Sequence, residues 1–179
     1  TLLDGVKQEY DLSGKFVIGS FARYEKFTPE FLELAKNCLE KVPRSVLILA
    51  GSNDQSPALE FLANEVREGK AILLGPSDTS ILGWIIDVFL DPFPVIAGFA
   101  ALEALAKGKP VFTVECAGLG NYVTSRDVDL ICQNQAEVIE KLSNTANSAK
   151  EYERLSEKSL VIARTFYDDE ALSDSIINS

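Results

Sequence analysis

Short apolar runs alternate with helical patterns along the chain, and this alternation constrains the fold more than any other feature of the sequence. The run SVLILA at 45–50, for example, is apolar on both faces of a strand. Strands of this kind, separated by helical segments, are typical of parallel sheets that helices cover on both sides. We therefore expect a doubly wound α/β fold, a Rossmann-like parallel sheet sandwiched by helices and joined by right-handed crossovers, with strands at 15–21, 45–50, 71–74, 87–90, 110–114 and 129–132.

The helices between these strands carry recognisable start and stop signals. Thr28, Pro29 and Glu30 supply an N-cap, a proline at the first helical position and an acidic first turn. Gly108 is expected to end a later helix as its C′ residue, and Asn134 is expected to cap the next one. The predicted helices span 29–42, 57–67, 98–107, 134–142 and 149–166; another short helix precedes the fourth strand, and a last one begins at 168.

Length and charge exclude several classes of protein. The 179 residues suffice for one domain, which we place at 15–179, behind a leader or linker segment at 1–14. A net charge of −10 repels phosphate backbones and anionic lipid headgroups, so nucleic acid and membrane surfaces are not expected partners. The sequence has no histidine, which excludes His-based zinc sites and Ser-His-Asp catalysis within this chain. No metal site is expected.

The most apolar stretch of the chain is Ile81–Leu90. Asp87 interrupts it and Asp91 follows it, so it cannot span a bilayer and is interpreted as a buried strand. Within it, Trp84 and Phe89 are expected in the core rather than on a stacking surface.

Cysteine usage and the first residue bear on the context of the chain. Cys38, Cys116 and Cys132 are odd in number and show no CxxC spacing, which favours a reducing, cytoplasmic compartment. The sequence begins at Thr1 and contains no methionine, so we expect it to be a fragment of a longer enzyme.

Two loops after predicted strands carry residues that suit an anionic ligand, in the region where such sheets bind their ligands. Arg23 and Lys26 follow the first strand and form a cation pair that suits a diphosphate, although two solvated surface charges give the same pattern. Small residues around Gly98 would let a phosphate approach the amides of a helix N-terminus, and Glu103 would accept hydrogen bonds from vicinal hydroxyls. Close helix–sheet packing would explain the small residues equally well. Neither a GxGxxG nor a P-loop motif is present.

Two motifs resemble a known family. The runs DVFLDPFP at 87–94 and LEALAKGKPV at 102–111 resemble the donor-site signature of GT-B glycosyltransferases. Phe21, Lys26 and Pro29, together with VPRSVL at 42–47, resemble one branch of them, the C-terminal catalytic half of O-linked N-acetylglucosaminyltransferases. The resemblance covers nearly the whole chain, from about residue 15 to residue 166, and implies two Rossmann-like domains facing a cleft, of which this chain would be the C-terminal one.

The resemblance implies roles for individual residues. Lys26 matches the lysine that binds the donor diphosphate, and it is the candidate catalytic residue because it would stabilise the departing diphosphate. Arg23 matches a glutamine beside that diphosphate and would be a charged replacement. Glu103 matches the acidic residue that holds the ribose hydroxyls. Ser77 lies in a loop that often contacts the nucleotide base in this family, although residues 77–79 also suit a helix cap.

At two places the sequence departs from the family pattern. Gly98, Phe99 and Ala100 occupy the stretch where the O-linked branch uses His-Thr-Thr against the phosphates, so only backbone amides would remain there. Retaining GT-B enzymes carry an E-x7-E pattern, and Val95 stands in place of its first glutamate. The second departure argues against the retaining subgroup.

The resemblance implies a glycosyltransferase donor domain. It would bind a nucleoside-diphosphate sugar, UDP-linked, for transfer to an unknown acceptor held by an N-terminal domain of the same protein, with no cofactor, and the fragment would be inactive alone. A UDP-sugar epimerase and a non-catalytic interaction module on the same fold stay open as alternatives. A flavodoxin-like receiver does not fit, because Arg23 and Lys26 stand where a receiver needs clustered acids.

Weaker candidates follow two other strands. Asn53 and Asp54 come after the second strand, but Gly-Ser-Asn-Asp is ordinary turn chemistry. Four polar residues after the fifth strand are candidates for acceptor or phosphate contacts by position alone: Asn121, Thr124, Ser125 and Arg126.

Overall fold

A parallel β-sheet organises the chain, as the sequence predicts. The computed structural model describes the backbone of residues 2–115 and 129–177. Within them, the strands form a six-stranded sheet in the order β3-β2-β1-β4-β5-β6. All its pairs are parallel. The strands are β1 (Phe16–Phe21), β2 (Ser45–Ala50), β3 (Ala71–Leu74), β4 (Val88–Leu90), β5 (Val111–Val114) and β6 (Ile131–Cys132). The doubly wound α/β fold is confirmed.

The strand order reverses between β1 and β4. The chain runs from β1 outward through β2 to β3, then crosses back to β4 on the other side of β1 and continues through β5 to β6. Neighbouring loops diverge at such a switch point and leave a crevice beyond the carboxyl ends of the two central strands. The loops after Phe21 and Leu90 therefore border the expected ligand position.

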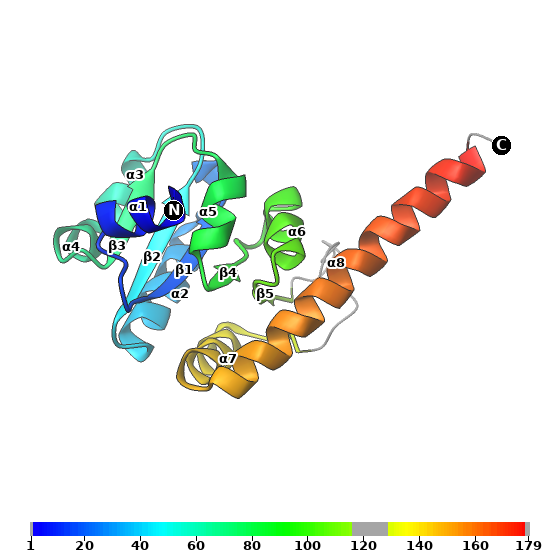
Figure 1. Cartoon of the computed structure of the whole chain (residues 1–179). Coiled ribbons are helices and arrows are strands. Elements are labelled where there is room, and N and C mark those ends of the chain that lie inside the picture. The colour runs from blue at the N-terminus through cyan, green and yellow to red at the C-terminus, as the bar shows by residue number, and fades with distance from the viewer. Residues whose placement is uncertain (1, 116–128, 178–179) are drawn as a thin grey trace.

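Helices cover both faces of the sheet (Figure 1). On one side α1 packs beside α5, α5 beside α6, and α6 beside α8; on the other side α2 packs against α7 and α3. Their bounds are α1 (Leu2–Glu9), α2 (Pro29–Lys41), α3 (Ser56–Phe61), α4 (Ala63–Arg67), α5 (Thr79–Ile85), α6 (Phe99–Ala106), α7 (Gln135–Asn147) and α8 (Ala149–Ile177), with a 3-10 helix η1 at Tyr24–Lys26.

The predicted helix caps are present. Thr28 Oγ1 accepts a hydrogen bond from the Phe31 amide at 3.3 Å, and Pro29 begins α2. Asn134 Oδ1 accepts from the Glu137 amide at 3.0 Å at the start of α7. Gly108 has a φ of +70°, the left-handed conformation that favours glycine after a helix.

Three local predictions are wrong. The segment 57–67 is two helices rather than one, because the fully buried Leu62 leaves the helical conformation (φ −99°, ψ 19°) between α3 and α4. No new helix begins at 168: α8 continues to Ile177, since neither glycine nor proline interrupts it. The stretch 81–90 is not one strand: residues 81–85 belong to α5, which is the short helix predicted before the fourth strand, and β4 spans 88–90, close to the predicted 87–90.

The two aromatic residues of that stretch have different environments. Phe89, on β4, is fully buried and packs edge-on against Phe21, as expected of a core residue. Trp84, on α5, is 53% exposed, and Lys107 Nζ lies 6.0 Å from the centre of its ring. Its predicted core position is wrong, because α5 turns this side chain away from the sheet and toward the end of α6.

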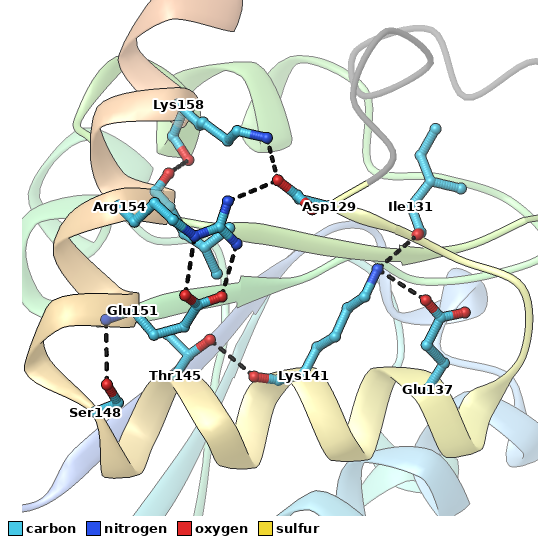
Figure 2. Close-up of polar contacts among 11 residues, drawn as sticks. Asp129, Ile131, Glu137, Lys141, Thr145, Ser148, Glu151, Arg154 and Lys158 are labelled. Carbon is cyan, nitrogen blue, oxygen red and sulfur yellow. Dashed lines mark hydrogen bonds and ion pairs between the residues drawn. The ribbon is translucent and has the colours of Figure 1, made fainter.

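A polar network ties the sheet edge at β6 to α7 and α8 (Figure 2). Asp129, just before β6, accepts hydrogen bonds from Arg154 Nη1 at 2.7 Å and from Lys158 Nζ, both on α8. Lys141, on α7, donates to the Ile131 carbonyl at 3.2 Å. The two positive side chains hold the pKa of Asp129 at about 2.

Candidate functional site

The loops after β1 and β4 meet at the switch point. Lys26 ends η1, just after β1, and its Nζ donates a hydrogen bond of 2.7 Å to the Ile96 carbonyl in the β4–α6 loop. Tyr24 holds η1 in place, because its hydroxyl bonds the carbonyls of Leu49 and Leu74 at 3.1 and 2.9 Å, near the ends of β2 and β3. The ammonium of Lys26 is thereby brought to the segment that leads into α6.

The peptide group that Lys26 contacts is held from its other end as well. Its carbonyl belongs to Ile96 and its N–H to Ala97, and that N–H donates a hydrogen bond of 2.8 Å to Asp91 Oδ1. Asp91 directly follows β4 and is 4% exposed. Burial raises the pKa of its carboxyl to about 7; the Ala97 amide, the neighbouring Thr113 hydroxyl and the positive charge of Lys26 offset part of that rise.

The N-terminus of α6 follows this peptide group directly. Gly98 precedes the helix with a φ of +71°, a left-handed conformation that side chains disfavour, and no side chain caps the helix. The amides of Phe99 and Ala100 begin the helix and therefore have no intrahelical acceptor. The Phe99 side chain is 77% exposed. Positive electrostatic potential and free donors are thus concentrated about two residues from the Lys26 contact.

Glu103 lies in the second turn of α6 and has a partner from another element. Thr79, at the start of α5, donates a hydrogen bond of 3.1 Å from its hydroxyl to Glu103 Oε2. With a rise of about 1.5 Å per residue, Glu103 stands roughly 7 Å along the helix from Gly98. Both side chains are therefore found near the start of α6, Lys26 through its contact with Ile96 and Glu103 in the second turn of the helix.

Two other predicted site residues make local contacts. Arg23 is exposed and pairs with Glu25 at 3.0 Å, and Asn53 donates to the same carboxylate at 2.5 Å. Ser77 is exposed and donates to the Gly75 carbonyl at 2.9 Å. Neither side chain contacts Lys26 or Glu103.

The weaker candidates make local contacts where they are described. Asp54 accepts from the Ser56 amide at 2.9 Å in the turn that starts α3, as ordinary turn chemistry predicts. Asp78 caps α5 by accepting from the Ser80 amide at 2.9 Å. The other four candidates lie outside the described residues: Asn121, Thr124, Ser125 and Arg126. Cys116 lies outside them as well.

Sequence reasoning treated two residues of this site as ordinary. Asp91 served only as a charge that ends the apolar stretch and as part of a family motif, although a lone carboxylate directly after a buried strand at a switch point is a signal of its own. Thr79 appeared as one residue of a helix cap; its contact with Glu103 spans 24 residues and had no local signal.

In the described part of the chain, no helix combines the length and the apolar character that crossing a membrane requires. The same residues contain no group of three or more Cys, Asp or Glu side chains arranged to hold a metal ion.

Comparison with known proteins gives structural matches. No protein-family model and no curated protein sequence matches the chain. An O-GlcNAc transferase mutant from Thermobaculum terrenum matches with a TM-score of 0.70 and 28% identity over 85% of this chain and 32% of its own. HepE from Anabaena, in complex with UDP and glucose, matches with a TM-score of 0.74 and 16% identity over 99% of this chain and 52% of its own. The pneumococcal O-GlcNAc transferase GtfA, in complex with UDP and GlcNAc, matches with a TM-score of 0.69 and 19% identity over 93% of this chain and 36% of its own.

The chain spans about a third to a half of the length of these three proteins. The match with HepE covers 99% of this chain. The chain therefore has the fold of the C-terminal domain of GT-B glycosyltransferases, and the proteins it resembles include O-GlcNAc transferases.

Proposed function

We propose that this chain is the donor-binding domain of a glycosyltransferase and binds a nucleoside-diphosphate sugar, UDP-linked, for transfer to an acceptor held by an N-terminal domain. One observation carries the proposal. The Lys26 ammonium is fixed at the β4–α6 loop by its 2.7 Å hydrogen bond to the Ile96 carbonyl, two residues before the N-terminus of α6. A side-chain cation and the positive end of a helix together suit a diphosphate.

This arrangement would promote sugar transfer by charge compensation. Negative charge develops on the diphosphate as the bond to the sugar breaks, and fixed positive groups at that position stabilise it. Lys26 would supply the full charge, and the amides of Phe99 and Ala100 would supply hydrogen bonds. Because residues 98–100 carry no polar side chain, the lysine would bear more of this stabilisation.

Glu103 would bind the ribose of the same nucleotide. A carboxylate accepts hydrogen bonds from vicinal hydroxyls, and Thr79 orients this one by occupying Oε2 from one side. The diphosphate at the start of α6 and the ribose near its second turn would be about one helical turn apart. Two of the similar proteins were solved with UDP, which supports the choice of nucleotide.

The cysteines support a cytoplasmic location. Cys38 and Cys132, the two cysteines in the described residues, are buried free thiols. Proteins of reducing compartments retain such thiols.

Calorimetric titration of UDP tests the proposal. Charge-assisted hydrogen bonds contribute roughly 1.5–3 kcal/mol, so Lys26→Met is expected to weaken UDP binding by about tenfold or more. Lys70→Met is the matched control: it removes an exposed lysine paired with Glu68, away from the switch point, and should leave UDP affinity unchanged. Equal UDP affinities of the wild type and Lys26→Met would show that Lys26 does not bind the diphosphate. Absence of UDP binding by the wild type would refute the proposed function.

Product analysis separates the proposed activity from its alternatives. The full-length protein is incubated with a UDP-sugar alone and then with candidate acceptors. A glycosyltransferase releases UDP in an acceptor-dependent way, whereas an epimerase changes the sugar without any acceptor. Binding with neither product would identify an interaction module.

A further inference from the structure

One peptide group joins the two charged side chains at the centre of the candidate site. The Ile96 carbonyl accepts from Lys26 Nζ at 2.7 Å, and the N–H of the same peptide group donates to Asp91 Oδ1 at 2.8 Å. Bond lengths within a peptide place the two charged groups no more than about 8 Å apart. Lys26 comes from the loop after β1 and Asp91 from the end of β4, so the two central strands are linked through the β4–α6 loop.

Among residues 2–115 and 129–177, few groups that could balance its charge face Asp91. Lys26 is the charged group among them; the loop contributes the Ala97 amide, and β5 contributes the Thr113 hydroxyl. The carboxyl is 4% exposed, and its own amide donates to the Phe112 carbonyl at 2.9 Å, which fixes the backbone. Because Asp91 itself is buried, water screens it less from a change in the charge near Lys26 than it would screen an exposed carboxylate.

We propose that Asp91 is a proton-linked positioning residue of the donor site, which takes up a proton when a nucleoside diphosphate binds at Lys26 and changes the charge across the peptide group that joins the two side chains. This inference rests on the proposed function, since it requires a diphosphate at that lysine. The physical reason is that a bound diphosphate satisfies the positive charge that stabilises the Asp91 carboxylate and adds negative charge nearby. The protonated carboxyl still accepts from the Ala97 amide through its carbonyl oxygen, so the loop keeps its anchor.

The sign of the pH dependence follows from linkage. If binding favours the protonated form, affinity rises as the pH falls through the pKa of Asp91 in the free protein, which is about 7. A rise of about one pKa unit on binding would make the wild type about fivefold weaker at pH 8 than a variant that is neutral at this position, and equal to it at pH 6.

The experiment measures UDP affinity of the full chain by calorimetry between about pH 6 and pH 8 for the wild type, Asp91→Asn and Asp87→Asn. UDP itself titrates in this range, but the ratio of two proteins' dissociation constants cancels that effect. Asp87→Asn is the control, because Asp87 is a partly buried carboxylate that also accepts from a backbone amide, that of Val17 at 2.7 Å, at the opposite end of β4. Burial raises its pKa too.

The ratio of the dissociation constants of wild type and Asp91→Asn is expected to rise from about one at pH 6 to about five at pH 8. In two buffers of different ionisation enthalpy, the wild type and Asp87→Asn should take up about half a proton more per UDP than Asp91→Asn near pH 7.5. A ratio that does not change with pH, as a merely structural role would give, overturns the inference. Failure of the wild type to bind UDP at every pH would instead refute the proposed function.

A second measurement needs no substitution and stands if Asp91→Asn does not fold. The Asp91 carboxyl carbon is titrated by NMR in the wild type with and without saturating UDP. Its midpoint should move upward when UDP is bound. A midpoint that stays in place or moves downward contradicts the proposal.

Discussion

Thr79 donates a 3.1 Å hydrogen bond to Glu103 Oε2 and so connects the first residue of α5 with the second turn of α6. The two residues are brought together because α5 and α6 pack side by side on one face of the sheet. The contact fixes one oxygen of the carboxylate and thereby orients the side chain that we assign to the ribose.

Glu103→Ala should weaken the binding of UDP by about tenfold, because two hydroxyls of the ribose lose a charged acceptor. It should weaken the binding of 2′-deoxy-UDP less, since one of those hydroxyls is already missing. Calorimetry measures the loss of binding free energy from wild type to Glu103→Ala for each ligand. The difference between the losses for UDP and for 2′-deoxy-UDP isolates the contact with the 2′-hydroxyl. An equal loss for the two ligands would place Glu103 away from the 2′-hydroxyl.

Thr79→Val removes the hydroxyl but keeps the shape of the side chain. We expect a loss in UDP affinity of about threefold, because the carboxylate of Glu103 loses its positioning partner. Thr79→Ser keeps the hydroxyl and should bind as the wild type does. In a Glu103→Ala background, Thr79→Val should leave UDP affinity unchanged, because the carboxylate that Thr79 orients is already missing. The same titration measures this.

Gly51→Ala should unfold the chain at markedly lower urea concentrations. A Cβ at position 51 would lie 1.7 Å from the Ala22 carbonyl oxygen, and that oxygen belongs to backbone that cannot move aside easily. A cost of about 2–4 kcal/mol is expected from such a clash. Gly75→Ala is the control, because nothing lies within 4 Å of its added Cβ. Similar unfolding midpoints for the two variants would contradict the packing of β2 against the loop after β1.

Asp129→Asn should lower the stability at neutral pH by up to about 1 kcal/mol, a modest figure because the ion pairs with Arg154 and Lys158 are partly exposed. The folded-state pKa of Asp129 is depressed to about 2 from an ordinary 3.8, so its contribution is present above pH 4 and is lost as the pH falls toward 2. Urea unfolding of both proteins at pH 7 and near pH 3 should show that the difference between their free energies of unfolding is smaller in acid. A difference that is constant with pH would mean that Asp129 acts through packing rather than charge.

The amino-acid sequence by itself determined the elements whose signals are local. The β2 run SVLILA and the β3 run at 71–74 form strands with the predicted bounds, because an uninterrupted apolar run favours a strand that a covering layer buries; β2 is buried throughout, and β3 lies beside it at the edge of the sheet. The caps at Thr28 and Asn134 formed as predicted, since a capping side chain and its amide are only three residues apart. The order of these elements also placed Lys26 and Glu103 beyond the carboxyl ends of their strands.

Tertiary structure alone decided which side chains meet there. The contacts of Lys26 with Ile96 and of Val17 with Asp87 each span 70 residues, and no pattern within one segment specifies them. The same holds for Leu62, whose burial breaks a helix that local propensity favours, and for Trp84, which α5 turns outward. Local periodicity indicates which face of an element is apolar. The packing of elements determines what that face contacts, and it places the buried carboxyl of Asp91 near Lys26.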